Sequence, residues 1–264
     1  MKKLVACVIV KNEARYLPEW FEYHLLLGVE HFYVYDNDSD DNIHDAVADY
    51  DTQVTLIHWP GRLRQQLLAY QHFFRHHAHD AQWAAVIDAD EFIRYQGPGT
   101  LSSFLSEQAP DIGGLEFPWI TFGTNGHRTR PSGLVIENYT LAHAVAPQQN
   151  CKSLCRPLAV DGEAIKSPHC LAYRPGWTAV ACHQALLALH HYTLRSYEDV
   201  VEKVRRGDAW SAETEAKRWA DPEAAVASLM KKYDGGSVVE KALLPFGREI
   251  HARFNARIEA RSRR

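Results

Sequence analysis

The chain has 264 residues, of which 46% are hydrophobic and 23% are charged, and its formal net charge is −4. This length suits one large domain or two small ones, and the composition excludes a disordered chain. The net negative charge argues against nucleic acid as the main partner, because nucleic-acid binders normally present a basic face. Five cysteines, an odd number without a dense framework, favour reduced thiols in a cytosolic protein.

The first 90 residues alternate between apolar runs and helical patterns. The run at residues 4–10 predicts a buried strand, since it is short for a signal-peptide core and too short to span a bilayer. Further strands are predicted at residues 30–36, 52–59 and 83–88, and helices at 13–28, 42–50 and 62–79. This order predicts an α/β fold, with mostly parallel strands and helices on both faces of the sheet.

Beyond residue 95 the pattern is less regular. We expect a short helix at 100–108, strands at 113–123, 134–145 and 153–160, and a basic amphipathic helix at 244–264. Ser196 and Asp199 form a capping-box pattern at the start of another helix, which Gly207 ends.

Polar residues follow three of the predicted strands, at 11–13, 36–41 and 88–91. The carboxyl ends of parallel strands share one edge of the sheet, where such folds bind ligands, so we expect these groups to meet there. Asp88, Asp90 and Glu91 place three carboxylates within four residues, which need water, a partner or a cation. A D-x-D pair can hold Mg²⁺ or Mn²⁺ and leave positions for phosphate oxygens. Alone it is a weak motif, and a solvated acidic turn is the alternative.

The segments "VIVKNEARYL", "YVYDNDSDDN", "WAAVIDADEFI" and "HHYTLRSYEDVV", in this order, resemble the family 2 glycosyltransferases and, more narrowly, the subgroup related to glycosyltransferase family 92. The resemblance covers residues 4 to about 207. It implies a GT-A fold of Rossmann-like type, a nucleotide-sugar donor, a divalent metal and transfer with inversion. It also implies a catalytic domain at 1–210, with a nucleotide-binding half (1–95) and an acceptor-binding half (96–210), before a C-terminal helical extension (211–264).

Site roles follow from the resemblance by position. The residues expected to bind the nucleotide, with UDP as the commonest choice, are Asn12, Glu13, Asp36, Asp38 and Asp88. The expected ligands of Mn²⁺ or Mg²⁺ are Asp88, Asp90 and His191. The adjacent His190 can exchange roles with His191, and Glu91 is expected to support the site from behind. An Asx-rich turn is the alternative for residues 36–41.

Inverting transfer needs a base that takes the proton of the acceptor hydroxyl. The chain lacks the clear E-D pair of the wider family, so the base is open: Glu116 and His127 lead, and Asp111 and Glu137 are weaker. Residues 118–133 are expected to form a flexible loop over the site. This loop is expected to contact sugar, phosphate or acceptor through Trp119, Phe122, Arg128 and Arg130. A later segment is expected to contact the diphosphate or the acceptor through Lys152 and Arg156.

Three rival hypotheses remain. Aspartate-based phosphohydrolases also carry D-x-D after a strand, but Phe92 stands where they have Thr or Val, and they use their first strand. A zinc-binding structural module would use loosely spaced ligands, namely Cys151, Cys155, His169, Cys170, Cys182 and His183. An inactive GT-A-like protein that only binds carbohydrate is the third.

The acceptor is expected to be a glycan or lipid-linked hydroxyl, in the synthesis of a cell-surface glycan. We expect a cytoplasmic protein. The arginines between 248 and 264 can reach anionic lipid, which would make it peripheral at the inner membrane, although a solvated helix or dimer contact is an equal alternative.

Overall fold

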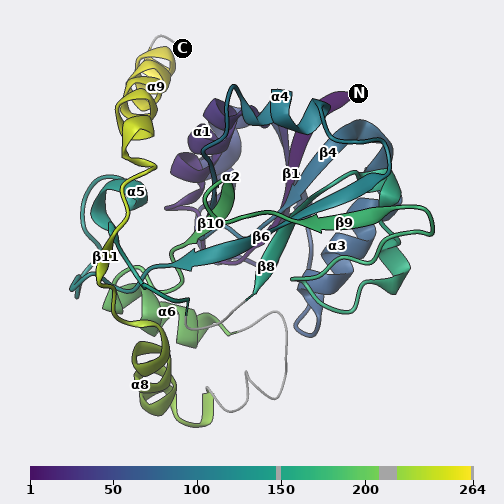
Figure 1. The fold of residues 1–264 in the computed structure, drawn as a ribbon. Helices are drawn as coiled ribbons and strands as arrows, with labels where there is room; N and C mark the ends of the chain where they lie inside the picture. The colour runs from purple at the N-terminus through teal and green to yellow at the C-terminus, as the bar shows by residue number, and fades with distance from the viewer. Residues whose placement is uncertain (147–149, 208–218, 263–264) are drawn as a thin grey trace.

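A computed structural model describes residues 1–146, 150–207 and 219–262 (Figure 1). Over these residues a nine-stranded sheet has the order β3-β2-β1-β4-β8-β6-β10-β5, and β9 pairs with β6. Its strands are β1 (Lys2–Val10), β2 (His31–Asp36), β3 (Val54–His58), β4 (Ala81–Val86), β5 (Glu91–Tyr95), β6 (Ile112–Thr121), β8 (Cys151–Cys155), β9 (Thr178–Ala181) and β10 (Leu187–His191). A separate two-stranded sheet pairs β7 (Leu141–Ala142) with β11 (Val238–Val239).

The helices flank this sheet on both faces and extend beyond one end (Figure 1). In the described part of the chain they are α1 (Leu17–Leu27), α2 (Ile43–Val47), α3 (Gln65–His76), α4 (Leu101–Ser106), α5 (Val135–Asn138), α6 (Tyr197–Arg206), α8 (Pro222–Tyr233) and α9 (Leu244–Ser262). None of them is both long and apolar enough to cross a lipid bilayer.

Strand β1 shows why helices cover both faces. Leu4, Ala6 and Val8 pack in the core that contains α1, whereas Val5 and Cys7 pack in the core that contains α3. Successive side chains of a strand point to opposite faces, so a strand covered on both sides must be apolar throughout. The predicted fold class, a mostly parallel α/β sheet with helices on both faces, is confirmed.

The order of the strands places a topological switch point between β1 and β4. From β1 the chain proceeds through β2 to β3 on one side and then returns to β4 on the other side, and all of these pairings are parallel. Sheets of this kind bind ligands beyond the carboxyl ends of the strands at such a point. Lys11–Glu13 follow β1 and residues 88–90 follow β4, so two of the predicted polar groups flank the switch point.

The second half of the sheet departs from the sequence prediction. β5 and β10 were not predicted, yet they pair antiparallel and complete one edge of the sheet. They are short and buried, and their polar residues, Glu91, Arg94, His190 and His191, leave neither an apolar run nor a regular alternation to identify a strand. The helix α8 was not predicted either, whereas the capping box at Ser196 and Asp199 is confirmed at the start of α6.

The strand predicted at residues 134–145 is wrong. The segment begins as α5, and only two of its residues form β7. Leu134, Val135 and Ile136 are buried in succession, with Tyr139 one turn further on, which is helical spacing that we interpreted as an apolar strand. The next predicted strand, 153–160, also ends earlier, because β8 stops at Cys155 and a 3₁₀ turn follows.

The basic helix α9 packs back against α1 (Figure 1). Glu22 of α1 is fully buried and pairs with Arg253 and Arg257 of α9. One turn further, Arg261 donates to the carboxylate of Asp49 at 2.7 Å. Three of the terminal arginines therefore hold the helix to the first 50 residues of the chain.

Candidate functional site

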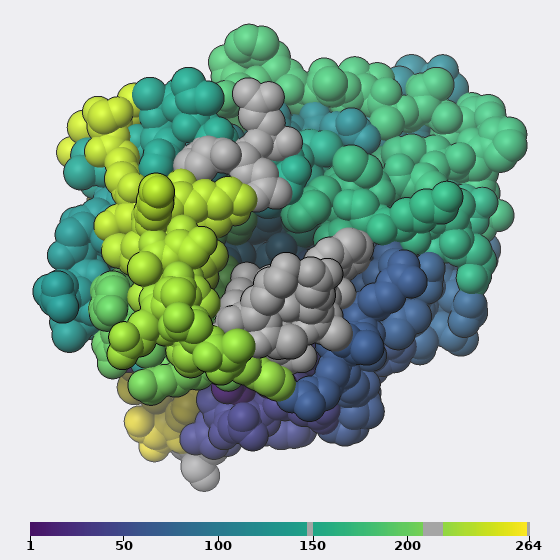
Figure 2. Space-filling view, turned by 90° about the horizontal axis from the view of Figure 1, so that it is seen from below, coloured from purple at the N-terminus to yellow at the C-terminus, as the bar shows by residue number. Residues whose placement is uncertain are grey.

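Two adjoining cavities open at the switch point, one of about 620 Å³ and one of about 190 Å³. Glu13, Asp90, Lys203 and Arg206 line both cavities and therefore form the wall between them. Figure 2 shows a hollow on the underside of the molecule, where blue segments of the N-terminal half meet green and yellow segments of the C-terminal half.

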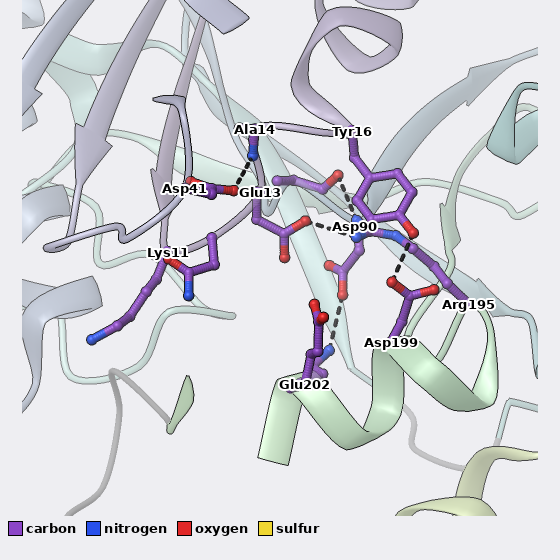
Figure 3. Close-up of polar contacts among 12 residues, drawn as sticks. Lys11, Glu13, Ala14, Tyr16, Asp41, Asp90, Arg195, Asp199 and Glu202 are labelled. Atoms are coloured by element: carbon purple, nitrogen blue, oxygen red, sulfur yellow. Dashed lines mark hydrogen bonds and ion pairs between the residues drawn. The ribbon is translucent and has the colours of Figure 1, made fainter. Parts of the chain in front are cut away.

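Two arginines hold Glu13 in this wall (Figure 3). Arg195 donates to its Oε2 at 2.7 Å and Arg206 to its Oε1 at 2.6 Å. Burial alone would raise the pKa of Glu13, but the two guanidinium groups outweigh it and lower the pKa. Arg195 also donates to the carbonyl of Ala89 at 3.2 Å and stacks on the ring of Tyr16 at 3.7 Å. Arg195 thus joins the loop after β1 to the loop after β4.

Asp90 faces the cavities with a different partner on each oxygen. The Lys203 ammonium lies 3.0 Å from Oδ2, and Nε2 of His191 lies 3.6 Å from Oδ1. Burial opposes ionisation, but Lys203 and His191 outweigh it and hold the pKa of Asp90 well below its ordinary value. Asp90 is therefore an ionised carboxylate with one cation already beside it.

Asp88, two residues earlier, lines the smaller cavity and is held from the core side through one of its oxygens. Its Oδ1 lies 3.0 Å from the Lys152 ammonium and accepts hydrogen bonds from Gln66 at 2.7 Å and Tyr70 at 3.1 Å. Lys152 is only 1% exposed and also lies 3.4 Å from the fully buried Glu91. Burial would lower the pKa of Lys152, but the carboxylates outweigh it and raise the pKa well above its ordinary value.

Lys152 was predicted to contact donor or acceptor from a loop, and that prediction is wrong. It is the second residue of β8, where its ammonium is enclosed and pairs with Asp88 and Glu91. Glu91, expected to support the site from behind, does so: it pairs with Lys152 and accepts the backbone N–H of Asp88 at 2.7 Å. Burial raises the pKa of Glu91 well above its ordinary value.

The three predicted metal ligands do not converge. In the ranges that the structure describes, no three His, Cys, Asp or Glu side chains are grouped so that they could hold a metal ion together. Asp90 and His191 nevertheless face each other, and Nδ1 of His191 is buried without a hydrogen-bond partner. This pair offers one oxygen and one nitrogen ligand, a set that suits Mn²⁺. His190 instead lies beside Phe122 and Glu240.

The predicted nucleotide-binding residues divide into two groups. Asp36 accepts the N–H of Ser39 at 3.1 Å within the turn after β2, which agrees with the Asx-rich turn alternative, whereas Asp38 accepts that of Gly61 at 3.2 Å in the loop after β3. Neither lines the two cavities, whereas Asn37 between them lines the smaller one. Asn12 lines the larger cavity, and its side-chain oxygen accepts the N–H of Asp40 at 2.7 Å.

The two leading candidates for the base lie away from the shared wall. Glu116 is half-buried on β6 opposite Ser153. The pKa of the nearby Cys151 thiol is raised mainly by burial and, to a smaller extent, by the negative charge of Glu116. Nε2 of His127 lies 3.2 Å from the carbonyl of Asn138. Neither residue is among those that line the two cavities, and the base stays a prediction.

The aromatic residues of the predicted loop are not exposed. Trp119 belongs to β6, and its ring lies 4.3 Å from that of His191. Phe122 is fully buried and stacks on Tyr192 at 4.6 Å, so the prediction that it stacks on a sugar is wrong. Arg128 is exposed, with its guanidinium over the Tyr197 ring at 5.4 Å, and Arg130 pairs with Asp199 of α6.

Comparison with known proteins now identifies the family. The model of glycosyltransferase family 92 matches residues 2–230. The chain belongs to glycosyltransferase family 92. A family 92 protein of Oryza sativa subsp. japonica is 31% identical over 205 residues, which cover 76% of this chain and 35% of that protein. One of Arabidopsis thaliana is 26% identical over 217 residues, which cover 77% of this chain and 37% of that protein. The chain thus spans about a third of the length of these relatives.

Solved structures resemble this family 92 chain more distantly. The S. aureus TarS 1–349 complex with UDP-GlcNAc matches with a TM-score of 0.42 and 14% identity, over 77% of this chain and 66% of that one. HddC from Yersinia pseudotuberculosis matches with a TM-score of 0.40 and 13% identity, over 76% of this chain and 97% of that one.

The cations beside Glu13 and Asp90 were missed in the sequence analysis. Arg195, Lys203 and Arg206 all reach Glu13 or Asp90, and none was predicted. A usable signal existed, because Lys203 and Arg206 are three residues apart on a helix whose capping box was recognised, and such residues share a face. The sequence does not say, however, that α6 lies beside the loop after β4.

Proposed function

We propose that this family 92 chain transfers a sugar from a nucleotide-diphospho-sugar to the hydroxyl group of an acceptor. The observation that carries the proposal is the composition of the cavity wall at the switch point. Two carboxylates of the wall, Glu13 and Asp90, meet three cations: Lys203 and Arg206 of the wall itself and Arg195, which lines the larger cavity. This excess of positive charge suits an anionic diphosphate, and the family supplies the class of reaction.

The nucleotide is proposed to bind over the carboxyl ends of β1 and β4. The smaller cavity lies there, with Lys11, Asn37 and Arg62 among its lining residues. The Asn37 amide is fixed by hydrogen bonds to the carbonyls of Trp59 and Gly61, both at 2.8 Å. That UDP is the nucleotide remains part of the proposal.

A divalent cation is part of the proposal, and the residues present fit it in part. Asp90 and His191 would hold it, whereas Asp88 is engaged with Lys152, Gln66 and Tyr70. A cation bound there would offset the charge that grows on the departing diphosphate. Arg195 would keep Asp90 in position through its hydrogen bond to Ala89. Inversion, and Glu116 or His127 as the base, are proposed only by resemblance.

The acceptor is proposed to be a glycan or lipid-linked hydroxyl, and the cytoplasmic location is proposed with it. Contact between the C-terminal helix and anionic lipid has less support than the sequence suggested. Arg253, Arg257 and Arg261 are already paired with Glu22 and Asp49. Lipid would have to compete with these ion pairs.

Calorimetric titration of UDP, GDP and CMP, each with and without Mn²⁺, tests the proposal. We expect one nucleotide to bind, more tightly with Mn²⁺, and Asp90→Asn to weaken that binding at least about tenfold through loss of a charge-assisted ligand. Asp51→Asn, an exposed turn residue, is the matched control and should bind like the wild type. Transfer from the sugar derivative of that nucleotide then tests turnover. Absence of binding by every nucleotide under both conditions contradicts the proposal and favours a carbohydrate-binding role.

A further inference from the structure

Each aspartate of the D-x-D pair has its own lysine. Lys152 lies 3.0 Å from Asp88, and Lys203 lies 3.0 Å from Asp90. The two pairs share this distance but differ in surroundings, because the Lys152 side chain is 1% exposed and the Lys203 side chain is 28% exposed. Only Lys203 lines the cavities.

The Lys203 ammonium is held by one carboxylate and one backbone carbonyl. It donates to Asp90 Oδ2 and to the carbonyl of Thr193, both at 3.0 Å. One helical turn further on, Arg206 donates to Glu13 and to the carbonyl of Lys11 at 2.7 Å. Helix α6 thus extends two cations into the wall between the cavities, where an anionic ligand would lie.

We propose that the Lys203 ammonium competes with a divalent cation for the Asp90 carboxylate, and that it binds the donor diphosphate when the divalent cation takes its place. The second half of this statement rests on the proposed function. A divalent cation on Asp90 would repel an ammonium that lies 3.0 Å from the same carboxylate. The flexible stem of Lys203 lines open space on both sides and can move, whereas Lys152 is enclosed.

Manganese binding without any nucleotide tests the competition. Free Mn²⁺ is measured by room-temperature electron paramagnetic resonance against wild type, Lys203→Met, Lys203→Arg and Lys231→Met. We expect Lys203→Met to bind Mn²⁺ at least about tenfold more tightly, because the competing charge is gone. Lys203→Arg keeps the charge and should resemble the wild type. So should Lys231→Met, which removes the same charge from an exposed position on α8.

Unchanged or weaker Mn²⁺ binding by Lys203→Met overturns the competition, and so does the absence of Mn²⁺ binding in every variant. The thermal unfolding midpoint of each variant, compared with that of the wild type, shows that the variants are folded.

Binding of UDP at a Mn²⁺ concentration that saturates every variant tests the contact with the diphosphate, because the Mn²⁺ ion then occupies Asp90 in place of Lys203. Here the sign reverses: we expect Lys203→Met to bind UDP at least about tenfold more weakly than the wild type, and Lys203→Arg to restore binding. Equal UDP affinity in Lys203→Met and wild type overturns this contact. If the wild type binds Mn²⁺ but no nucleotide, the proposed function fails together with this contact, while the manganese comparison still decides the competition.

Discussion

Asp88 and Asp90 stand two residues apart in one motif, yet the fold treats them in opposite ways. Both carboxylates line the smaller cavity, but their lysines differ: Lys152 is 1% exposed and lies in the core beside Glu91, whereas Lys203 is 28% exposed and comes from a surface helix. A lysine enclosed in the core needs a permanent partner, because desolvation of its charge is costly. A lysine beside open space can exchange its partner. One acidic motif can therefore hold a fixed structural cation on one carboxylate and an exchangeable cation on the other.

The largest effect is expected from Lys152→Met. This change leaves two carboxylates without their cation, including the fully buried Glu91, so we expect a loss of about 3–5 kcal/mol in the free energy of unfolding. Urea denaturation followed by circular dichroism measures it. A loss below about 1 kcal/mol would mean that Lys152, like Lys203, can leave its carboxylate, and the two lysines would then not differ.

A third carboxylate, Glu19, is held by backbone N–H groups instead of by a lysine. It accepts hydrogen bonds from the backbone N–H groups of Val135 at 2.7 Å and Ile136 at 3.0 Å, and burial raises its pKa to about 7. A raised folded-state pKa means that the stability it contributes is present below the unfolded pKa and is lost as the pH rises toward 7. We expect a loss of about 3 kcal/mol across that window, absent in Glu19→Gln, in urea denaturation at several pH values.

The Glu13→Gln variant removes a negative charge from the same cavity wall. The variant loses two charge-assisted hydrogen bonds from Arg195 and Arg206, for which we expect a loss of about 1.5–3 kcal/mol at neutral pH. Because the pKa of Glu13 is lowered, its contribution is present above the unfolded pKa and is lost as the pH falls through the folded one. The two denaturation curves should therefore approach each other in acid, and a constant difference would contradict this assignment.

The smallest effect on stability is expected from Lys203→Met. The Lys203 side chain is 28% exposed, and His191 stays beside Asp90 when the lysine is removed, so we expect the free energy of unfolding to fall by only about 1 kcal/mol. The same denaturation assay applies, with Lys152→Met as its counterpart. Equal losses from the two lysines would remove the distinction between the fixed and the exchangeable charge.

The fold of the first 90 residues was predictable because its signals are local. The apolar run of β1 and the alternation of strands and helices locate the strand ends that carry Glu13, Asp88 and Asp90, whereas the strand order that makes the switch point comes from the structure. The partners of those acids were not predictable. Lys203 is 113 residues from Asp90 along the chain, and no spacing rule connects them. Phe122 was misjudged for the same reason, since its burial depends on contact with Tyr192 of another segment.

The start of helix α6 fixes where its cations lie. Ser196 and Asp199 cap it reciprocally, and Asp199 also accepts hydrogen bonds from the Tyr16 hydroxyl and the Arg130 guanidinium, both at 2.7 Å. Lys203 follows the cap by two helical turns, and each residue advances a helix by about 100°. One inserted or deleted residue between cap and lysine would therefore swing the ammonium away from Asp90. Substitutions between these two points leave the direction of the lysine unchanged, but an alignment gap there would signal a site built on a different cation.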